Sequence, residues 1–435
     1  MRRLSQLFGG LLLTLLLALP AAQRDSAGLS TLRTAETLTA AGQRTAAAQH
    51  YTQALAYLPA SPEPALRLAA LYCDWQKPAE GQLALAEALR RGAPAAAIRP
   101  LHRDFLIQAG DWPALEHTTR AWLTRHPGDV LALAQLTQAL LQQHDCPASA
   151  ESAAQWYALA PHDPRARLTW GVLGRDTVPE VLCSASPLLC SGYRSCENPA
   201  QCAALLGQLL LRQEEWALAA CVLTQPAQGH APAEIYAWYG TALERLGLVE
   251  LARDYYEQAA AVAPAEPLGW LLLGFNALET EDTETALSAL QQAHTLDPGN
   301  PTPCLGLALA IAQEGRYEAV DTWIEAALER APEDVEVWKS AARFYLERHL
   351  SQGGHPLRAA EGAVRLAPDD AEAWLLLGWA QLQENDPAAA LQTLERALAL
   401  PQAHHLRGLA LQRLGRIAEA QEAFTRAADL GYVAP

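Results

Sequence analysis

The sequence predicts an all-α fold built from one helical hairpin that is copied along most of the chain. A small residue recurs every 34 residues, at Gly240, Gly274 and Ala308. A second small residue keeps the same step, at Ala259, Ala293 and Ala327. A fixed period of this length indicates a repeat protein in which each copy is one supersecondary unit.

The copy from Pro267 to Asn300 shows why each unit is expected to hold two helices. Apolar residues at helical spacing form one stripe on a first helix, at Trp270, Leu273, Gly274 and Ala277. A second stripe follows at Ala286, Leu290 and Ala293. Glu281 and Asp282 lie in the turn between the stripes, and Pro298 ends the second helix.

This pattern resembles the tetratricopeptide repeat, which reads W-x2-L-G, then A-x3-F-x2-A, then P. Another copy fills the same positions with Trp374, Leu377, Gly378, Ala390, Leu394, Ala397 and Pro401. Two further matches begin at Tyr236 and Cys304. The resemblance implies a right-handed superhelical solenoid of about eleven helix-turn-helix repeats, in which stacked neighbours bury one another's apolar faces.

The register divides the chain into four parts. Residues 1–22 are expected to be a signal peptide or N-terminal anchor, and 23–163 to hold repeats 1–4. Residues 164–200 are a degenerate, cysteine-rich repeat slot, and 201–435 hold repeats 5–11. The step from Ala397 to Ala427 is only 30 residues, so we expect the last repeat to have a shortened first helix.

The first 22 residues have the order of a secretory signal. Arg2 and Arg3 precede an apolar run from Phe8 to Leu19, and small residues follow it. The sequence therefore predicts an exported protein of the bacterial cell envelope, periplasmic or extracellular. The alternative is a protein anchored to the membrane by residues 1–22.

The degenerate slot and the helix after it contain four cysteines, Cys183, Cys190, Cys196 and Cys202. In an exported chain these predict two disulfides, whose pairing the sequence leaves open. A tetrathiolate zinc site and a set of free or buried thiols are the alternatives. Cys73, Cys221 and Cys304 lie on helical stripes and are expected to be small core residues, whereas Cys146 lies in a turn and either pairs or stays free.

Composition and motifs argue against several classes of function. The formal net charge is −16, so binding of nucleic acid through a cationic face is not expected. No catalytic, phosphate-binding or dinucleotide-binding motif is found. We therefore expect no enzyme activity and no catalytic, cofactor-binding or metal-ligating residue.

The resemblance implies a concave groove lined by the first helices of successive repeats. Apolar residues outside the packing stripe are expected to face it, at Leu271, Phe275, Leu278, Leu305, Leu309, Leu375, Trp379 and Leu382. Phe275 and Trp379 are the candidate anchors, because aromatic residues dominate interface energetics. Alternatively, these side chains pack against the neighbouring first helix.

The predicted function is that of a non-catalytic scaffold, which binds a protein or peptide in the groove. Two alternatives remain open at this point. One is an accessory subunit that handles polysaccharide in envelope assembly or export, and the other is a metal or redox module in the cysteine segment.

Overall fold

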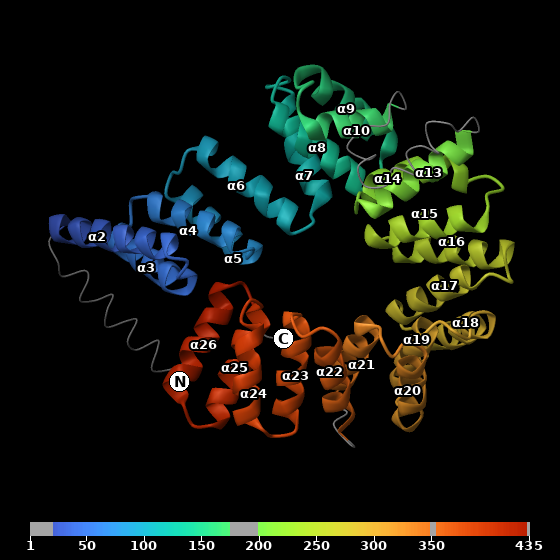
Figure 1. The fold of residues 1–435 in the computed structure, drawn as a ribbon. Coiled ribbons are helices and arrows are strands. Elements are labelled where there is room, and N and C mark those ends of the chain that lie inside the picture. The colour runs from blue at the N-terminus through green and yellow to red at the C-terminus, as the bar shows by residue number, and fades with distance from the viewer. Residues whose placement is uncertain (1–20, 175–198, 349–353, 433–435) are drawn as a thin grey trace. The chain divides into compact units, whose positions relative to one another are not determined.

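The computed structural model describes residues 21–174, 199–348 and 354–432 (Figure 1). Within these ranges there are twenty-three α-helices and no strand, which confirms the predicted all-α class. Consecutive helices pack as antiparallel pairs, as a helical-hairpin repeat requires. The chain forms two compact units, residues 112–348 and a unit that combines residues 1–111 with residues 349–435.

The unit of residues 112–348 contains thirteen of the described helices. These are α7 (Trp112–Leu123), α8 (Val130–Gln142), α9 (Cys146–Leu159), α10 (Pro164–Leu173), α13 (Pro199–Arg212), α14 (Trp216–Ala227), α15 (Ala233–Arg245), α16 (Val249–Val262), α17 (Pro267–Glu279), α18 (Thr283–Leu296), α19 (Thr302–Gln313), α20 (Val320–Arg330) and α21 (Val335–Glu347). The degenerate slot predicted at 164–200 lies inside this unit.

The other unit contains helices from both ends of the sequence. From the first half come α2 (Ala21–Ala40), α3 (Arg44–Tyr57), α4 (Glu63–Asp74), α5 (Pro78–Arg90) and α6 (Ala95–Gln108). From the second half come α22 (His355–Leu366), α23 (Ala371–Gln383), α24 (Pro387–Leu394), α25 (Pro401–Arg413) and α26 (Ile417–Asp429). Among the described helices, none combines the length and the hydropathy needed to cross a membrane.

The 34-residue period of the sequence also appears in the backbone of the turn between the two helices of a repeat. One residue of this turn has a positive φ, at Gly42 (72°), Gln76 (56°), Gly110 (67°) and His144 (60°). Glycine takes this left-handed conformation without steric cost, whereas a side chain makes it less favourable. The structure nevertheless places a glutamine and a histidine there.

The glycine of the first helix makes room for a large side chain of the second helix. A Cβ atom added at Gly274 would stand 2.5 Å from Cγ of Leu290. The same relation joins Gly240 to Tyr256, where the closest distance would be 2.6 Å. Such contacts are too close for any Cβ atom, so the periodic glycine is explained by helix packing.

Replacing Gly274 with leucine is expected to overpack α17 against α18 and to lower the free energy of unfolding by about 1–3 kcal/mol. Because repeats couple mainly to their neighbours, faster hydrogen exchange should centre on α17 and α18. Gly299→Ala is the matched control, since its added Cβ would meet only Asp297 Oδ1, at 3.7 Å. Equal loosening of every repeat by Gly274→Leu would contradict this local picture.

In three repeats, a tryptophan of the first helix ties the repeat to the preceding one. An indole N–H donates to a carbonyl six residues earlier in three repeats, from Trp270 to Pro264 (3.1 Å), Trp338 to Pro332 (2.9 Å) and Trp374 to Pro368 (2.7 Å). His404 Nε2 lies 3.1 Å from the Leu398 carbonyl oxygen and holds the corresponding position. In these repeats the bond fixes the start of the first helix against the end of the previous second helix.

The prediction of a shortened first helix in the last repeat is wrong. Helix α25 has 13 residues, as α23 does. The missing residues come from the connection before it, because α24 ends at Leu394 and a 3-10 turn covers Glu395–Ala397. Pro401 then takes the first position of α25, where the missing N–H costs nothing.

Helix α26 contacts α3 within the unit that both ends of the sequence share. The buried Asp429 carboxylate accepts hydrogen bonds from the N–H and the hydroxyl of Thr45, both at 2.7 Å. The indole N–H of Trp75 donates to the Ala428 carbonyl at 2.8 Å. In an open linear array each repeat would touch only its sequence neighbours, so the sequence period did not predict this contact.

Candidate functional site

The eight residues predicted to face a groove differ in their exposure. Leu278 and Leu382 are 8% and 2% exposed and belong to the core, so neither offers surface to a partner. The expectation that they face a groove is therefore wrong, because both lie on the side of their helix that meets the next repeat. The other six are half-buried: Leu271, Phe275, Leu305, Leu309, Leu375 and Trp379.

The half-buried groups also contribute to packing between repeats. Leu271, Phe275 and Leu309 lie against a core cluster formed by residues that include Leu290 and Leu307. A Cβ atom at Gly306 of α19 would stand 3.2 Å from the tip of the Phe275 ring. The first helices α17 and α19 therefore touch through Phe275, and the side chains of this row keep only part of their surface for a partner.

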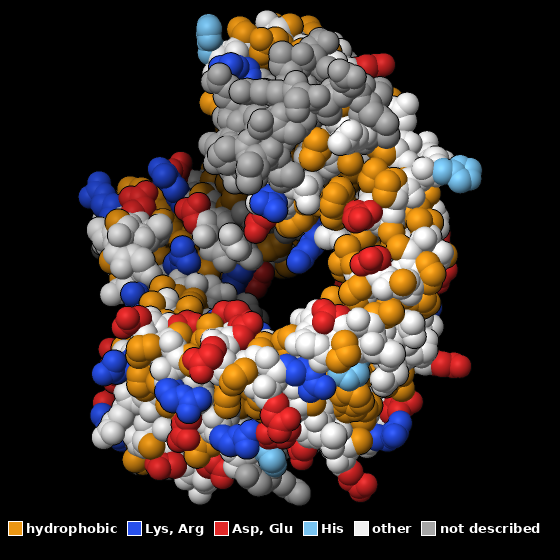
Figure 2. Space-filling view, turned by 45° about the vertical axis from the view of Figure 1, so that its right-hand side comes forward, with side chains coloured by type: hydrophobic (Ala, Val, Ile, Leu, Met, Phe, Trp, Pro, Cys, Tyr) orange, Lys and Arg blue, Asp and Glu red, His pale blue; other side chains and the backbone are white. Residues whose placement is uncertain are grey.

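Charged side chains of both signs are interspersed over the face shown in Figure 2. Several side chains form ion pairs, such as Arg253 with Asp282 between neighbouring repeats and Arg120 with Glu116 inside α7. On this face, side chains of opposite charge are therefore mixed and do not gather into a patch of one sign.

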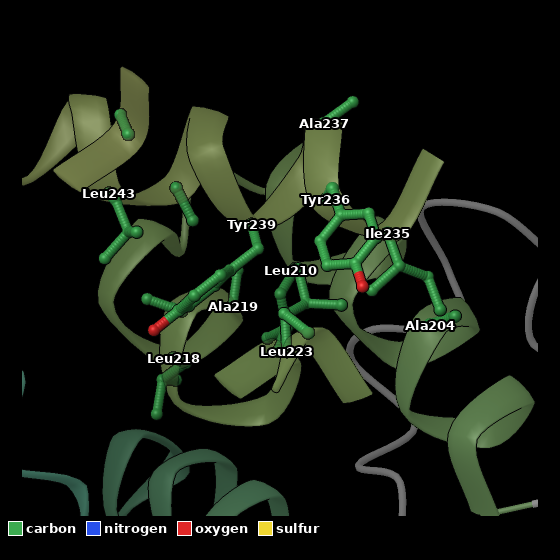
Figure 3. Close-up of a cluster of buried hydrophobic side chains, with 14 of the residues drawn as sticks. Ala204, Leu210, Leu218, Ala219, Leu223, Ile235, Tyr236, Ala237, Tyr239 and Leu243 are labelled. Carbon is green, nitrogen blue, oxygen red and sulfur yellow. The ribbon is translucent and has the colours of Figure 1, made fainter. Parts of the chain in front are cut away.

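A pocket of about 860 Å³ lies in the unit of residues 112–348, between helices α9, α10, α13, α14 and α15. Its apolar lining includes Val172, Leu173, Leu206, Val222 and Ile235. Side chains of α13, α14 and α15 belong to one buried cluster that shares Leu206 and Ile235 with the pocket, and the Tyr239 ring of this cluster extends toward α14 (Figure 3). Three cysteines also line the pocket, Cys146, Cys202 and Cys221.

Cys146 and Cys221 form a disulfide that links the first residue of α9 to the middle of α14. Their Cα atoms are 5.5 Å apart. The expectation that Cys221 is a core thiol is therefore wrong. Helical periodicity places Cys221 on an inner face of α14. It does not reveal that the start of α9 brings Cys146 within bonding distance of Cys221.

The other cysteines have different outcomes. Cys304 is a buried free thiol, as expected for a core residue, and Cys73 is a half-buried free thiol. Cys202 is disulfide-bonded. Cys183, Cys190 and Cys196 lie outside the described residues, so two disulfides among these four cysteines remain a prediction.

His144 lies beside the disulfide and was not singled out by the sequence analysis. Its Nδ1 is 3.6 Å from Sγ of Cys146, and its Nε2 is 2.9 Å from the hydroxyl of Tyr239. Burial lowers the pKa of His144, which favours the neutral imidazole. The only sequence signal for this cluster is the spacing of His144 and Cys146, two residues apart at the start of a helix.

The stacked helical hairpins with their periodic glycine and tryptophan agree with comparisons with known families. Models of the tetratricopeptide repeat match residues 277–344, residues 240–301 and 348–404, and residues 401–430. Residues 240–344 and 348–430 of this chain match tetratricopeptide repeats. The matched repeats include α17, α19 and α23, which carry the predicted groove residues.

Similar proteins are found both by sequence and among solved structures. Interferon-induced protein with tetratricopeptide repeats 2 of Cricetulus griseus is 26% identical over 132 residues, which cover 30% of this chain and 28% of that protein. The chain thus matches under a third of the length of this relative. Yeast Tom70 is 15% identical, covers 94% of this chain and 93% of its own, and has a TM-score of 0.44.

A second similar solved structure is pilF of Pseudomonas aeruginosa, with 21% identity, a TM-score of 0.33, and coverage of 42% of this chain and 79% of its own. The pocket with the disulfide lies outside every stretch that the repeat models match, because all of its lining residues precede residue 240. The repeat consensus therefore assigns no role to that pocket.

Proposed function

We propose that this tetratricopeptide chain is a non-catalytic scaffold that binds a protein or peptide on the first-helix face of α17 and α19. The observation that carries the proposal is the row of half-buried apolar side chains on two consecutive first helices, Leu271, Phe275, Leu305 and Leu309. Proteins with these repeats generally mediate protein–protein interaction. A partner would gain affinity by covering the surface that packing between the repeats leaves open.

Phe275 and Leu309 are suited to anchor a peptide, because each lies against the buried cluster and is held in place by it. A side chain that is fixed before binding loses little conformational entropy when a partner arrives. In contrast, Leu251 of α16 is 39% exposed and lies on a second helix, outside this row. These residues therefore provide a test and its control.

Replacing Phe275 and Leu309 together with alanine is expected to weaken peptide binding at least 10-fold, as loss of two anchors predicts. The probe is a random peptide display library selected on the wild-type chain, followed by titration of the enriched peptides. Leu251→Ala should bind these peptides within about 2-fold of wild type. Circular dichroism and thermal melting would establish that the double variant remains folded.

Enriched peptides that bind wild type and the double variant equally would contradict the assigned face. A glycan array tested in parallel distinguishes the polysaccharide alternative, because binding to glycans without any peptide enrichment would favour it. The matched control also separates the loss of two anchors from a general loss of apolar surface.

We also propose that the protein is exported to an oxidising compartment of the cell envelope. The N-terminal order of basic, apolar and small residues supports this, and so does the disulfide between Cys146 and Cys221. Alkylation of free thiols in acid-quenched cells tests the proposal. Complete alkylation of Cys146 and Cys221 in the producing bacterium would argue against export.

A further inference from the structure

We propose that His144, Cys146 and Cys221 form a zinc site that becomes available when the disulfide between the two cysteines is reduced. The site would be distinct from the peptide-binding face, since it lies at the pocket between α9 and α14. The inference does not depend on the proposed function.

The donor atoms are already gathered in one place. One ring nitrogen of His144 and the Sγ atoms of Cys146 and Cys221 all lie within 4.8 Å of one another. In tetrahedral zinc sites the Zn–S and Zn–N distances are about 2.3 and 2.0–2.1 Å, so the ligand atoms lie about 3–4 Å apart. Rotation of the two cysteine side chains about their Cα–Cβ bonds would therefore suffice to reach this spacing after reduction.

The imidazole of His144 is oriented as a metal ligand requires. Its Nε2 is 2.9 Å from the Tyr239 hydroxyl, and its Nδ1 faces Sγ of Cys146. When Nε2–H donates to Tyr239, Nδ1 carries the lone pair that a metal needs. Histidine ligands in metal sites commonly donate their other N–H to an oxygen in this way, which fixes both tautomer and ring orientation.

The backbone around the three ligands is also held in place. His144 occupies the left-handed turn position with φ of 60°, which directs the chain into α9. The side chain of Asp145 accepts a hydrogen bond from the Ala148 N–H and caps this helix at its first turn. Cys221 follows the buried residues Ala219 and Ala220 of α14. Two ligands on a capped turn and one on a packed helix make a preorganised set.

The fourth coordination position would open toward the pocket. Cys146 and Cys221 both line it, and the pocket has room for a water molecule as the remaining ligand. Zinc favours four-coordinate sites with nitrogen and sulfur ligands, and a site with three protein ligands keeps one exchangeable position. The chemical class of the ligand set is thus Cys2His with water.

A dithiol reductant would convert the disulfide into the zinc-binding form. The dithiol transfers two electrons and two protons to the Cys146–Cys221 disulfide, which becomes two thiols, while the reductant becomes a disulfide. Zn²⁺ then displaces the two thiol protons and binds two thiolates and the neutral imidazole. The metal itself is neither oxidised nor reduced, and oxidation of the cysteines releases it.

The experiment uses the full chain, reduced under nitrogen with a phosphine and titrated with Co²⁺ and then with Zn²⁺. We expect visible bands of tetrahedral cobalt together with thiolate-to-cobalt charge transfer, and replacement of both by zinc. Cys146→Ser and Cys221→Ser should abolish the signal of this site. Tyr239→Phe should keep the ligands but weaken binding about 10–100-fold, because the imidazole loses the nearer hydroxyl at Nε2 and keeps only that of Thr224, 3.4 Å away.

Two controls separate this site from the other thiols of the reduced chain. Cys202→Ser removes a sulfur from the same pocket but should leave the His144-dependent signal unchanged. His144→Ala keeps both cysteines, so its disulfide can form and the variant stays testable if the cysteine variants do not fold. The oxidised wild type should bind no cobalt here. A cobalt spectrum and affinity unchanged in both His144→Ala and Tyr239→Phe, or no thiolate band at all, would overturn the proposal.

Discussion

Replacing Cys146 and Cys221 together with alanine is expected to lower the free energy of unfolding of the unit of residues 112–348 by about 4 kcal/mol. The two cysteines are separated by 75 residues, so their bond closes a long loop of the unfolded chain. Loop-closure entropy grows with loop length, which places this disulfide toward the upper end of the usual range. The loop contains α9, α10 and α13 and the degenerate repeat slot.

Urea unfolding of the oxidised wild type and the oxidised double variant would measure this difference. Cys304→Ala is the matched control, because Cys304 is a buried free thiol in the same unit. Its loss should cost only about 1 kcal/mol, as expected for removing one buried apolar group. A double variant within 1 kcal/mol of wild type would show that the unfolded chain without the disulfide keeps residual structure that already restrains this loop.

Replacing Tyr256 with alanine is expected to lower the free energy of unfolding by about 3–5 kcal/mol. Tyr256 of α16 is fully buried and fills the space that Gly240 of α15 leaves open. Its hydroxyl donates to Oε2 of Glu244 at 3.1 Å, and the Asn276 side chain donates to Oε1 at 2.9 Å. Alanine would leave a cavity and remove one partner of a carboxylate.

Tyr256→Phe distinguishes packing from hydrogen bonding. Because phenylalanine keeps the ring, we expect a loss of only about 1 kcal/mol from the missing hydrogen bond. Chemical unfolding of both variants at neutral pH would measure the two contributions. Equal losses for phenylalanine and alanine would mean that the hydroxyl network, rather than the ring, is the main stabilising element.

The free energies of unfolding of the wild type and of Tyr256→Phe should also differ in their dependence on pH. Burial is the main cause that raises the pKa of Tyr256 above its ordinary value of 10, so its ionised form is disfavoured in the folded state. The contribution of Tyr256 is therefore fully present below pH 10 and decreases as the pH rises above it, because the unfolded chain ionises more readily. Tyr256→Phe should lack this part of the alkaline loss of stability.

The sequence was sufficient for the architecture of the repeat. Gly240 and its partner Tyr256 lie in one copy, 16 residues apart, and Gly274 and Leu290 have the same spacing in the next copy. A local pattern therefore encodes which side chain meets which glycine. Trp270 and the Pro264 carbonyl belong to neighbouring copies but are only six residues apart, so their contact is local as well. Short-range contacts of this kind follow from helical periodicity and turn chemistry alone.

Helical spacing alone determined only in part how exposed the predicted groove residues are. Spacing on α17 and α23 puts Phe275 and Trp379 outside the packing stripe, and both are half-buried, so their place in a groove stays a prediction. It failed for Leu278 and Leu382, because the angle at which the next repeat packs decides how much of a helix is covered. That angle depends on side chains of another repeat.

Contacts between distant parts of the sequence were decided by the tertiary structure. The bond from Cys146 to Cys221, the approach of His144 to Tyr239, and the contact of Thr45 with Asp429 join residues 75, 95 and 384 positions apart. A repeat period states that neighbouring copies stack, but small rotations from one copy to the next accumulate along the chain. Which distant residues meet depends on that accumulated rotation, and no local pattern in the sequence records it.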